Sequence, residues 1–355
     1  IGNELFVWLS YYSVIMTTAR FLLVIPVFWI FGSELTIFFN FQLFIATIEI
    51  SVIMIKAKNL MPLSDPSRMH LLNRNIGNII KFSLSIALTT SIWVLVTQLD
   101  KVMLSKILSL RDYGYFSMAV MAASGLGLIS GPVSNVIIPR MTILYSQQNI
   151  NGLLATYRHT TQLLSIFLAP IILIFSFYAK EVLFVWTNNL DFSSQTAYIF
   201  SCYAIGYAFS SFIVFPYCLQ IASGKLFLHI AGSIIFLCLM PFSLMYFFGT
   251  GGFQAIGYAW LLLNGLYFFL WIPVIHAKYL AGMHFLWLWN DIISIFILPT
   301  IICTIVFYFI PIPTDRLVLV LFLAALASFL ILFALLSSSL CRAKIRDKFY
   351  NRGLL

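Results

Sequence analysis

Two residues of opposite charge lie deep inside apolar stretches of the sequence. Arg20 lies in the stretch IMTTARFLL (15–23), and Glu49 lies in IATIEI (45–50). A charge in the middle of a bilayer costs at least about 2.5 kcal/mol on insertion scales, and such residues often mark transport pathways. Arg20 is therefore a candidate to bind an anionic substrate, with Glu49 as its neighbour or counter-ion.

The spacing of these two residues predicts that they meet. The two stretches would form a helical hairpin, in which Arg20 lies 14 residues before Glu34 and Glu49 lies 15 residues after it. At 1.5 Å per residue both separations are roughly 21–22 Å along a helix, so both side chains should lie at the same depth. This arrangement allows two interpretations. One is a structural ion pair, and the other is a wet cavity in which Arg20 meets an anionic cargo.

Further candidates lie near the third and fourth apolar stretches. Asp100 and Lys101 close the third stretch, where such a pair is commonly a simple helix end. Gly131, Pro132 and Pro139 interrupt the fourth. Proline removes a backbone donor, and such breaks are tolerated where a cavity or a neighbouring helix satisfies the freed carbonyls. We expect a broken helix here, of the kind that transporters use near substrate sites.

The sequence has no motif for metal, nucleotide or covalent chemistry. Its five cysteines and five histidines show neither CxxC nor paired-histidine spacing, so we expect free thiols and no metal site. It also has neither a phosphate-binding glycine loop nor a nucleophile elbow. We therefore predict no enzymatic activity and no cofactor, with H⁺ or Na⁺ as candidate coupling ions.

Composition indicates which elements must carry the candidate residues. Of 355 residues, 62% are hydrophobic and only 9% are charged, whereas a soluble domain has about 25% charged residues. The sequence therefore predicts an all-α polytopic membrane protein with about ten transmembrane helices, since about 20 apolar residues cross a bilayer. The ten stretches are 8–32, 35–56, 77–98, 114–137, 159–178, 194–220, 226–248, 254–275, 288–310 and 316–338.

The basic residues predict the orientation. One set of alternate loops holds 14 Lys and Arg residues and the opposite set holds five, while Arg20 lies inside a span. Basic residues gather in cytoplasmic loops, so this bias places the C-terminus and the 57–76 loop in the cytoplasm. The net charge of +9 reflects the same loop charges and gives no reason to expect nucleic acid. The larger set is Lys56, Lys58, Arg68, Arg74, Lys81, Arg140, Arg158, Lys225, Lys278, Arg342, Lys344, Arg346, Lys348 and Arg352, and the smaller set is Lys101, Lys106, Arg111, Lys180 and Arg316.

Residues 99–112 alternate between apolar and polar side chains at helical spacing. This pattern is typical of a helix that lies in the membrane interface. A simple extension of the 77–98 helix explains the pattern equally well.

Residues 99–147 contain an Asp-Lys at a helix end, an amphipathic stretch, a Gly-Tyr, a small-residue helix and a late proline. In this pattern they resemble the bacterial polysaccharide flippases of the Wzx type, in the superfamily that also includes multidrug extruders and lipid II flippases. Residues 19–44 resemble the fifth and sixth helices of that family. The resemblance implies a MATE-like fold of two bundles, with four N-terminal helices missing from this chain. It implies the last two helices of the first bundle at 1–56, a cytoplasmic linker at 57–76, a six-helix bundle at 77–275, two additional helices at 276–340 and a basic cytoplasmic tail at 341–355.

The resemblance also implies a cargo and its surroundings. The expected cargo is an undecaprenyl-pyrophosphate-linked oligosaccharide, such as an O-antigen or capsule repeat unit, moved across the bacterial inner membrane. An O-antigen polymerase and a chain-length regulator would be its partners besides the lipid bilayer. Arg20 is the cation best placed by depth to meet the diphosphate, and Lys101, Arg111 and Lys180 would serve release on the periplasmic side.

Two alternatives are weaker. A cation-coupled drug extruder of the same fold commonly needs acidic residues in its lumen, and only Glu49 is deeply placed. A membrane-embedded O-antigen polymerase or glycosyltransferase usually carries a large extracytoplasmic loop. The longest such loop expected here has about 15 residues, which argues against that class.

Overall fold

The computed structural model describes residues 6–32, 34–60 and 66–342. The chain forms two compact units, residues 1–80 and 81–355, and we describe each by itself. Within the described ranges every regular element is a helix, and nine segments are long and apolar enough to cross a bilayer. The prediction of an all-α polytopic membrane protein is confirmed.

The difference between nine segments and ten predicted spans lies in one long stretch. The segment Phe227–Tyr279 has 53 residues. A straight helix of that length would measure about 80 Å, more than twice the roughly 30 Å of a hydrocarbon core. Gly252 interrupts it with a non-helical backbone (φ 64°, ψ −150°). This segment therefore holds both predicted spans, 226–248 and 254–275.

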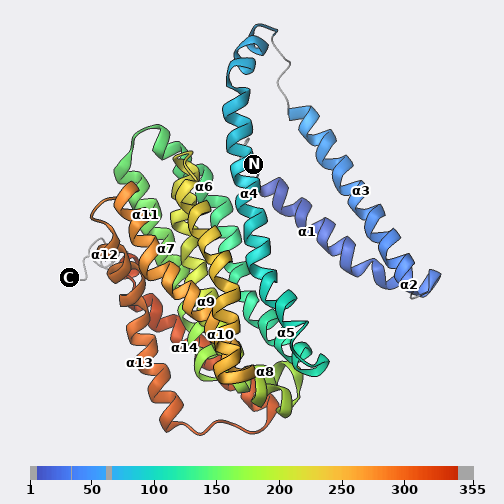
Figure 1. Ribbon diagram of the computed structural model, residues 1–355, viewed down its shortest axis with the longest axis vertical. Coiled ribbons are helices and arrows are strands. Elements are labelled where there is room, and N and C mark those ends of the chain that lie inside the picture. The colour runs from blue at the N-terminus through green and yellow to red at the C-terminus, as the bar shows by residue number, and fades with distance from the viewer. Residues whose placement is uncertain (1–5, 33, 61–65, 343–355) are drawn as a thin grey trace, which may run out of the picture. The chain divides into compact units, whose positions relative to one another are not determined.

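The first unit contains a helical hairpin (Figure 1). Helices α1 (Phe6–Leu22) and α2 (Val24–Phe31) follow each other, and α3 (Leu35–Leu60) returns alongside them. The short break falls between α1 and α2, because Pro26 has no N–H to donate to the carbonyl one turn earlier. Gly32 ends α2 with a φ of 94°, a conformation that glycine adopts without steric cost.

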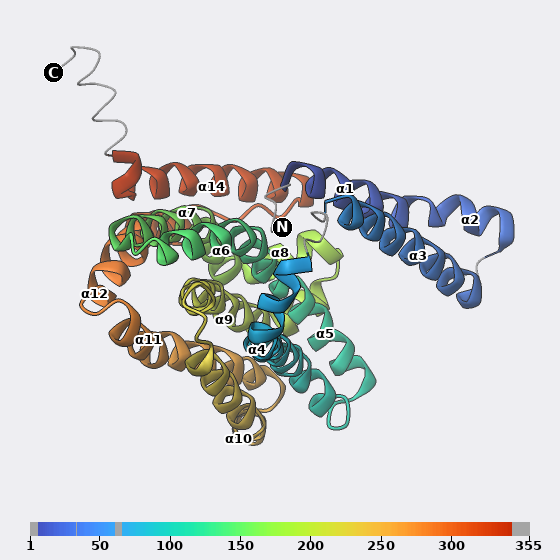
Figure 2. The ribbon, with the colours of Figure 1, turned by 90° about the horizontal axis from the view of Figure 1, so that it is seen from above.

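The second unit is a bundle around α9 (Leu190–Ala222), which packs against α5, α6, α7, α8 and α10 (Figure 2). Helix α4 (Pro66–Leu104) enters this unit at Lys81. The other elements are α5 (Leu110–Ser124), the 3₁₀ helix η1 (Gly125–Ile129), α6 (Ser130–Ser146), α7 (Ile150–Phe177), α8 (Ala179–Thr187), α10 (Phe227–Leu266), the π-helix η2 (Tyr267–Trp271), α11 (Ile272–Tyr279), α12 (His284–Trp287), the π-helix η3 (Leu288–Ile293), α13 (Ser294–Phe309) and α14 (Arg316–Ser337).

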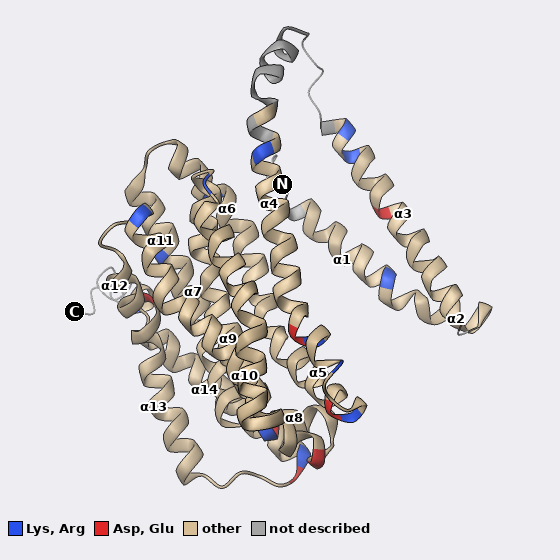
Figure 3. Ribbon diagram, viewed as in Figure 1, with Lys and Arg blue, Asp and Glu red and all other residues tan. Residues whose placement is uncertain are grey.

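Close packing of α9 against α10 depends on glycine. A Cβ atom at Gly206 would lie 2.3 Å from Cδ1 of Trp260, so only glycine allows the indole to approach α9. Trp260 in turn stacks on Tyr203, with ring centroids 5.5 Å apart and an interplanar angle of 5°. Neither α10 nor α13 carries a Lys, Arg, Asp or Glu (Figure 3), as expected for helices whose outer faces contact lipid.

The ends of α3 and α4 decide two of the predicted boundaries. Helix α3 continues to Leu60 and α4 begins at Pro66, so most of the predicted 57–76 linker is helical. Helix α4 also continues to Leu104 and is followed by a turn. Residues 99–112 therefore form no separate interfacial helix, and the alternative interpretation, an extension of the 77–98 helix, is correct as far as Leu104. The helix continues because one stripe of α4, ending in Leu104, is buried in the bundle. The side chains of Arg68 and Arg74, and the tail from residue 343, lie outside the described residues.

Candidate functional site

A cavity of about 460 Å³ lies in the second unit between α4, the α5–η1–α6 segment, α9 and α10. Most of its lining surface is apolar, and we call it the polar cavity after the hydroxyl, amide and lysine groups set within that surface. Its lining combines hydroxyl groups, aromatic rings and one lysine. The lining residues are Thr89, Thr90, Trp93, Thr97, Gln98, Lys101, Ser124, Gly127, Leu128, Ser130, Tyr207, Ser210, Ile213, Val214, Tyr217 and His229.

One stripe of α4 supplies much of this lining. Thr89, Trp93, Thr97 and Lys101 recur every four residues, and residues at that spacing share one face of a helix. The adjacent stripe of Ile92, Val96, Asp100 and Leu104 is buried. Burial of the second stripe therefore directs the first into the cavity.

The hydroxyl groups of the lining donate their hydrogens to their own helices. Thr89 Oγ1 donates to the carbonyl of Ser85 at 2.7 Å, and Ser210 Oγ donates to that of Tyr207 at 2.9 Å. Thr90, Thr97, Ser124 and Ser130 do the same at 2.7–3.1 Å. A hydroxyl oxygen keeps lone pairs after donating its hydrogen. These six groups can therefore accept hydrogen bonds from a ligand rich in hydroxyl groups.

Lys101 is the cation of the polar cavity. Its Nζ donates to the carbonyl of Thr97 at 3.1 Å and to Oε1 of Gln98 at 3.3 Å. Within the part of the chain that the structure describes, it forms no ion pair. Both of its hydrogen-bond acceptors are neutral, so its charge can interact with an anionic ligand.

Asp100, the neighbour of Lys101, has a positioning role. Only 1% of it is exposed, and it is not part of the cavity lining. Its Oδ2 accepts a hydrogen bond of 2.6 Å from the hydroxyl of Tyr203, and its Oδ1 accepts one of 2.7 Å from the main-chain N–H of Lys101. Asp100 therefore fastens the end of α4 to α9.

The two other cations predicted to serve release, Arg111 and Lys180, are not among the described lining residues of the polar cavity. Arg111, at the start of α5, forms an exposed ion pair with Asp191 at the start of α9. Asp191 also accepts from the hydroxyl of Tyr115 at 3.1 Å and from Gln195 Nε2 at 2.6 Å. Lys180 lies exposed in the first turn of α8. With neither residue in the described lining, their role in release stays a prediction.

In place of a break at Gly131, Pro132 and Pro139, the structure has a 3₁₀ turn ahead of these residues, within one continuous helical segment, Leu110–Ser146. The segment Gly125–Ile129 is a 3₁₀ helix between α5 and α6, and its Gly127 and Leu128 line the polar cavity. Pro132 is the third residue of α6 and directly follows the 3₁₀ turn, where it offers no N–H to the carbonyl of Leu128 one turn earlier. Pro139 lies inside α6 without ending it, so the expectation that it breaks the helix is wrong. Gly131 is in the first turn of α6, with open space around its Cα.

Arg20 and Glu49 meet in the first unit, as their spacing predicts. Nη2 of Arg20 forms an ion pair with Oε2 of Glu49, and their side chains are 35% and 33% exposed. The hydroxyl of Tyr12 donates to the main-chain carbonyl of Glu49 at 2.7 Å. These contacts join α1 to α3, and the role of Arg20 in cargo binding stays a prediction.

The sequence agrees with a known family over the part of the chain that holds most of these residues. The family described as polysaccharide biosynthesis protein matches residues 8–190, just over half of the 355 residues. The chain belongs to this family. Searches among curated proteins and among solved structures gave no match. The family match contains Arg20, Glu49 and the α4 stripe of the polar cavity, while the α9 and α10 walls lie beyond it.

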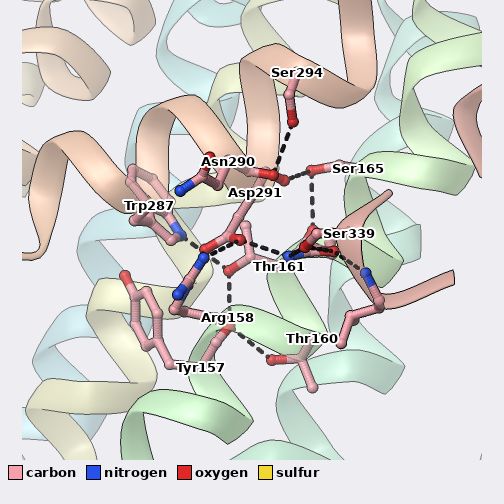
Figure 4. A network of polar contacts seen from close by, with 12 residues as sticks. Tyr157, Arg158, Thr160, Thr161, Ser165, Trp287, Asn290, Asp291, Ser294 and Ser339 are labelled. Carbon is pink, nitrogen blue, oxygen red and sulfur yellow. Dashed lines mark hydrogen bonds and ion pairs between the residues drawn. The ribbon is translucent and has the colours of Figure 1, made fainter. Parts of the chain in front are cut away.

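One ion pair, with a fully buried carboxylate, was not predicted from the sequence (Figure 4). Arg158 of α7 donates to Asp291 of η3 through Nε (2.8 Å to Oδ2) and Nη2 (3.1 Å to Oδ1). Asp291 is fully buried and also accepts from Gln162 Nε2 at 2.6 Å. The sequence analysis assigned Arg158 to a cytoplasmic loop. The sequence signal for the pair is Asp291, a charged residue inside the apolar stretch WLWNDIISIFIL (287–298).

Proposed function

We propose that this protein is a flippase that moves an undecaprenyl-pyrophosphate-linked oligosaccharide from the cytoplasmic to the periplasmic leaflet of the inner membrane. The observation that carries the proposal is the polar cavity, with its hydroxyl acceptors, its aromatic rings and Lys101, which forms no ion pair with any residue that the structure describes. Most of the lining surface is apolar, and the hydroxyl, amide and ammonium groups set within it are of the kind that mark a path for a polar solute through a membrane protein.

Each class of lining group suits one part of this cargo. Sugar hydroxyls can donate to the Thr and Ser oxygens, and the apolar faces of sugar rings can pack on Trp93, Tyr207 and Tyr217. The ammonium of Lys101 can attract the diphosphate, since its nearest acceptors are neutral. The polyprenyl chain can stay in lipid, because it needs no polar partner.

In this proposal the cavity opens alternately to the two sides of the membrane and no bond is made or broken. H⁺ or Na⁺ would be the coupling ion. An O-antigen polymerase and a chain-length regulator would act together with the protein. A drug extruder is less well supported. Within the described lining the charged group is a lysine and no carboxylate accompanies it, which is unfavourable for binding cationic drugs.

The test uses full-length protein in proteoliposomes with a labelled undecaprenyl-pyrophosphate oligosaccharide, whose exposure on the opposite leaflet is followed over time. We expect protein-dependent exposure that falls at least tenfold in Lys101→Gln. Lys106→Gln is the matched control, because Lys106 is exposed, lies five residues away and is not part of the lining. Protein-dependent exposure that Lys101→Gln leaves unchanged would remove the cavity from the mechanism. No exposure with folded protein would favour drug export instead.

A further inference from the structure

A second cavity, of about 570 Å³, lies at a different place in the bundle. Its walls are the first half of α7, the turn between α11 and α12, and the segment that follows α14. We call it the α7–α12 pocket. It shares no lining residue with the polar cavity, so it has no part in the function proposed above.

Arg158 gives this pocket hydrogen-bond donors. One edge of its guanidinium is held by Asp291 through Nε and Nη2 (Figure 4). A guanidinium has five N–H groups, so this bidentate pairing leaves others free. The side chain is 34% exposed and lines the pocket beside His159. The Arg158 guanidinium is thus held rigidly by a buried carboxylate and presents its remaining N–H groups to the pocket.

Among the residues that the structure describes, the pocket presents no exposed carboxylate. Asp291 is fully buried, and its two oxygens accept three hydrogen bonds from Arg158 and Gln162. No other carboxylate is among the described lining residues. An anionic group can therefore approach Arg158 without meeting an exposed carboxylate, whereas a cationic group finds no partner.

The position and remaining walls of the pocket suit a lipid. Arg158 is the ninth residue of α7, at the helix end that the distribution of basic residues predicts to be cytoplasmic. The apolar side chains of Leu154, Leu286 and Leu340 line the pocket next to the polar groups. A phospholipid has the same combination, a charged phosphate attached to a glycerol and acyl chains. Basic pockets between helices at the cytoplasmic side are known to bind anionic lipid headgroups.

We propose that the α7–α12 pocket binds the headgroup phosphate of an anionic phospholipid from the cytoplasmic leaflet, through Arg158. Binding there would also hold the end of α14 in place. Gln162 Oε1 accepts from Ser338 Oγ at 2.8 Å and from the N–H of Leu340 at 3.2 Å, and Gln162 and Leu340 both line the pocket. The lipid would thus stabilise the contact between α7 and the segment after α14.

The test measures thermal unfolding of full-length protein in detergent with added phosphatidylglycerol, phosphatidylcholine or inorganic phosphate. We expect phosphatidylglycerol alone to raise Tm, by roughly 3 °C or more at saturation. Ala155→Glu introduces a carboxylate three residues before Arg158, at an exposed lining position that leaves the Asp291 network intact. It should weaken the apparent affinity for phosphatidylglycerol about tenfold, because the new carboxylate competes for the free N–H groups.

Two controls separate this effect from others. Ala155→Gln has nearly the same size as Ala155→Glu without the charge and should keep the affinity within about twofold. Arg140→Gln removes an exposed basic residue outside the pocket and should also keep it, which excludes a general effect of surface charge. Equal stabilisation by phosphatidylcholine, or an unchanged affinity in Ala155→Glu, would overturn the proposal. An equal shift with inorganic phosphate would replace the lipid by free phosphate.

Discussion

The hydroxyl of Tyr203 donates a hydrogen bond of 2.6 Å to Oδ2 of Asp100 and joins two helices that are far apart in the sequence. Both residues are buried, and the second oxygen of Asp100 is occupied by the N–H of Lys101. This contact sets the position of α4 relative to α9 at the end where Lys101 enters the polar cavity. The geometry of the cavity therefore depends on a residue that does not line it.

Tyr203→Phe should destabilise the protein by about 1–3 kcal/mol, because it leaves a buried carboxylate oxygen without its donor. The measurement is the free energy of unfolding in mixed micelles. Tyr178→Phe is the control: the Tyr178 hydroxyl is buried and has no partner among the described protein groups, so its removal should leave the free energy of unfolding unchanged or raise it. Equal losses in the two variants would mean that the Asp100 contact has no specific role.

Gly206→Ala should destabilise the bundle, because the added Cβ would lie 2.3 Å from Trp260. Overpacking of this kind typically costs about 1–3 kcal/mol. Gly131→Ala provides the comparison, since a Cβ at Gly131 meets nothing within 4 Å. In a helix that change should be neutral or stabilising by up to about 1 kcal/mol. Thermal unfolding of both variants in the same detergent would decide the matter, and a stable Gly206→Ala protein would contradict the packing described for α9 and α10.

Arg20→Ala should abolish transport in proteoliposomes while the protein still inserts into the membrane. Removing the guanidinium takes away the cation that the sequence predicts for the cargo diphosphate. Insertion is checked by membrane fractionation and transport by the labelled-oligosaccharide assay. Normal transport by this variant would reduce Arg20 to a structural charge.

Stability of the Arg20–Glu49 pair gives a separate prediction. Glu49→Gln alone should destabilise the protein, because it leaves Arg20 without its counter-ion in the membrane. The double variant Arg20→Ala/Glu49→Gln should recover part of that loss, since both charges are then gone. The quantity to measure is the free energy of unfolding of the single and double variants. A double variant less stable than Glu49→Gln would contradict the ion pair as a structural unit.

Arg158→Leu should destabilise the second unit strongly, because Asp291 is fully buried and would lose its counter-ion. Breaking a buried pair from one side costs about 3–5 kcal/mol, and we expect the lower end because Arg158 is 34% exposed. The double variant Arg158→Leu/Asp291→Leu should be more stable than Arg158→Leu. A double-mutant cycle on unfolding free energies measures this difference, and purely additive effects would show that the pair is not coupled.

The pairing of Arg20 with Glu49 was predictable because it depends only on local geometry. Two helices joined by a short turn must place residues equally far from that turn at the same depth, and the apolar stretches mark both helices. The membrane class was predictable for a similar reason, since composition decides whether a surface can be hydrated. Span boundaries were less predictable, because 57–76 holds polar residues that are compatible with helix as well as loop.

The sequence by itself therefore determined a polytopic helical membrane protein, the positions of its spans and the contact between Arg20 and Glu49. Only the tertiary structure decided that Lys101 faces a polar cavity, that Asp100 lies behind it and that Arg158 pairs with Asp291 across 133 positions of the chain. The physical reason is that lipid-facing and core-facing sides of a membrane helix are both apolar. The periodicity of apolar residues therefore does not identify which side of the helix faces the protein core. The partners of a buried polar group become known only when the packing of the helices is known.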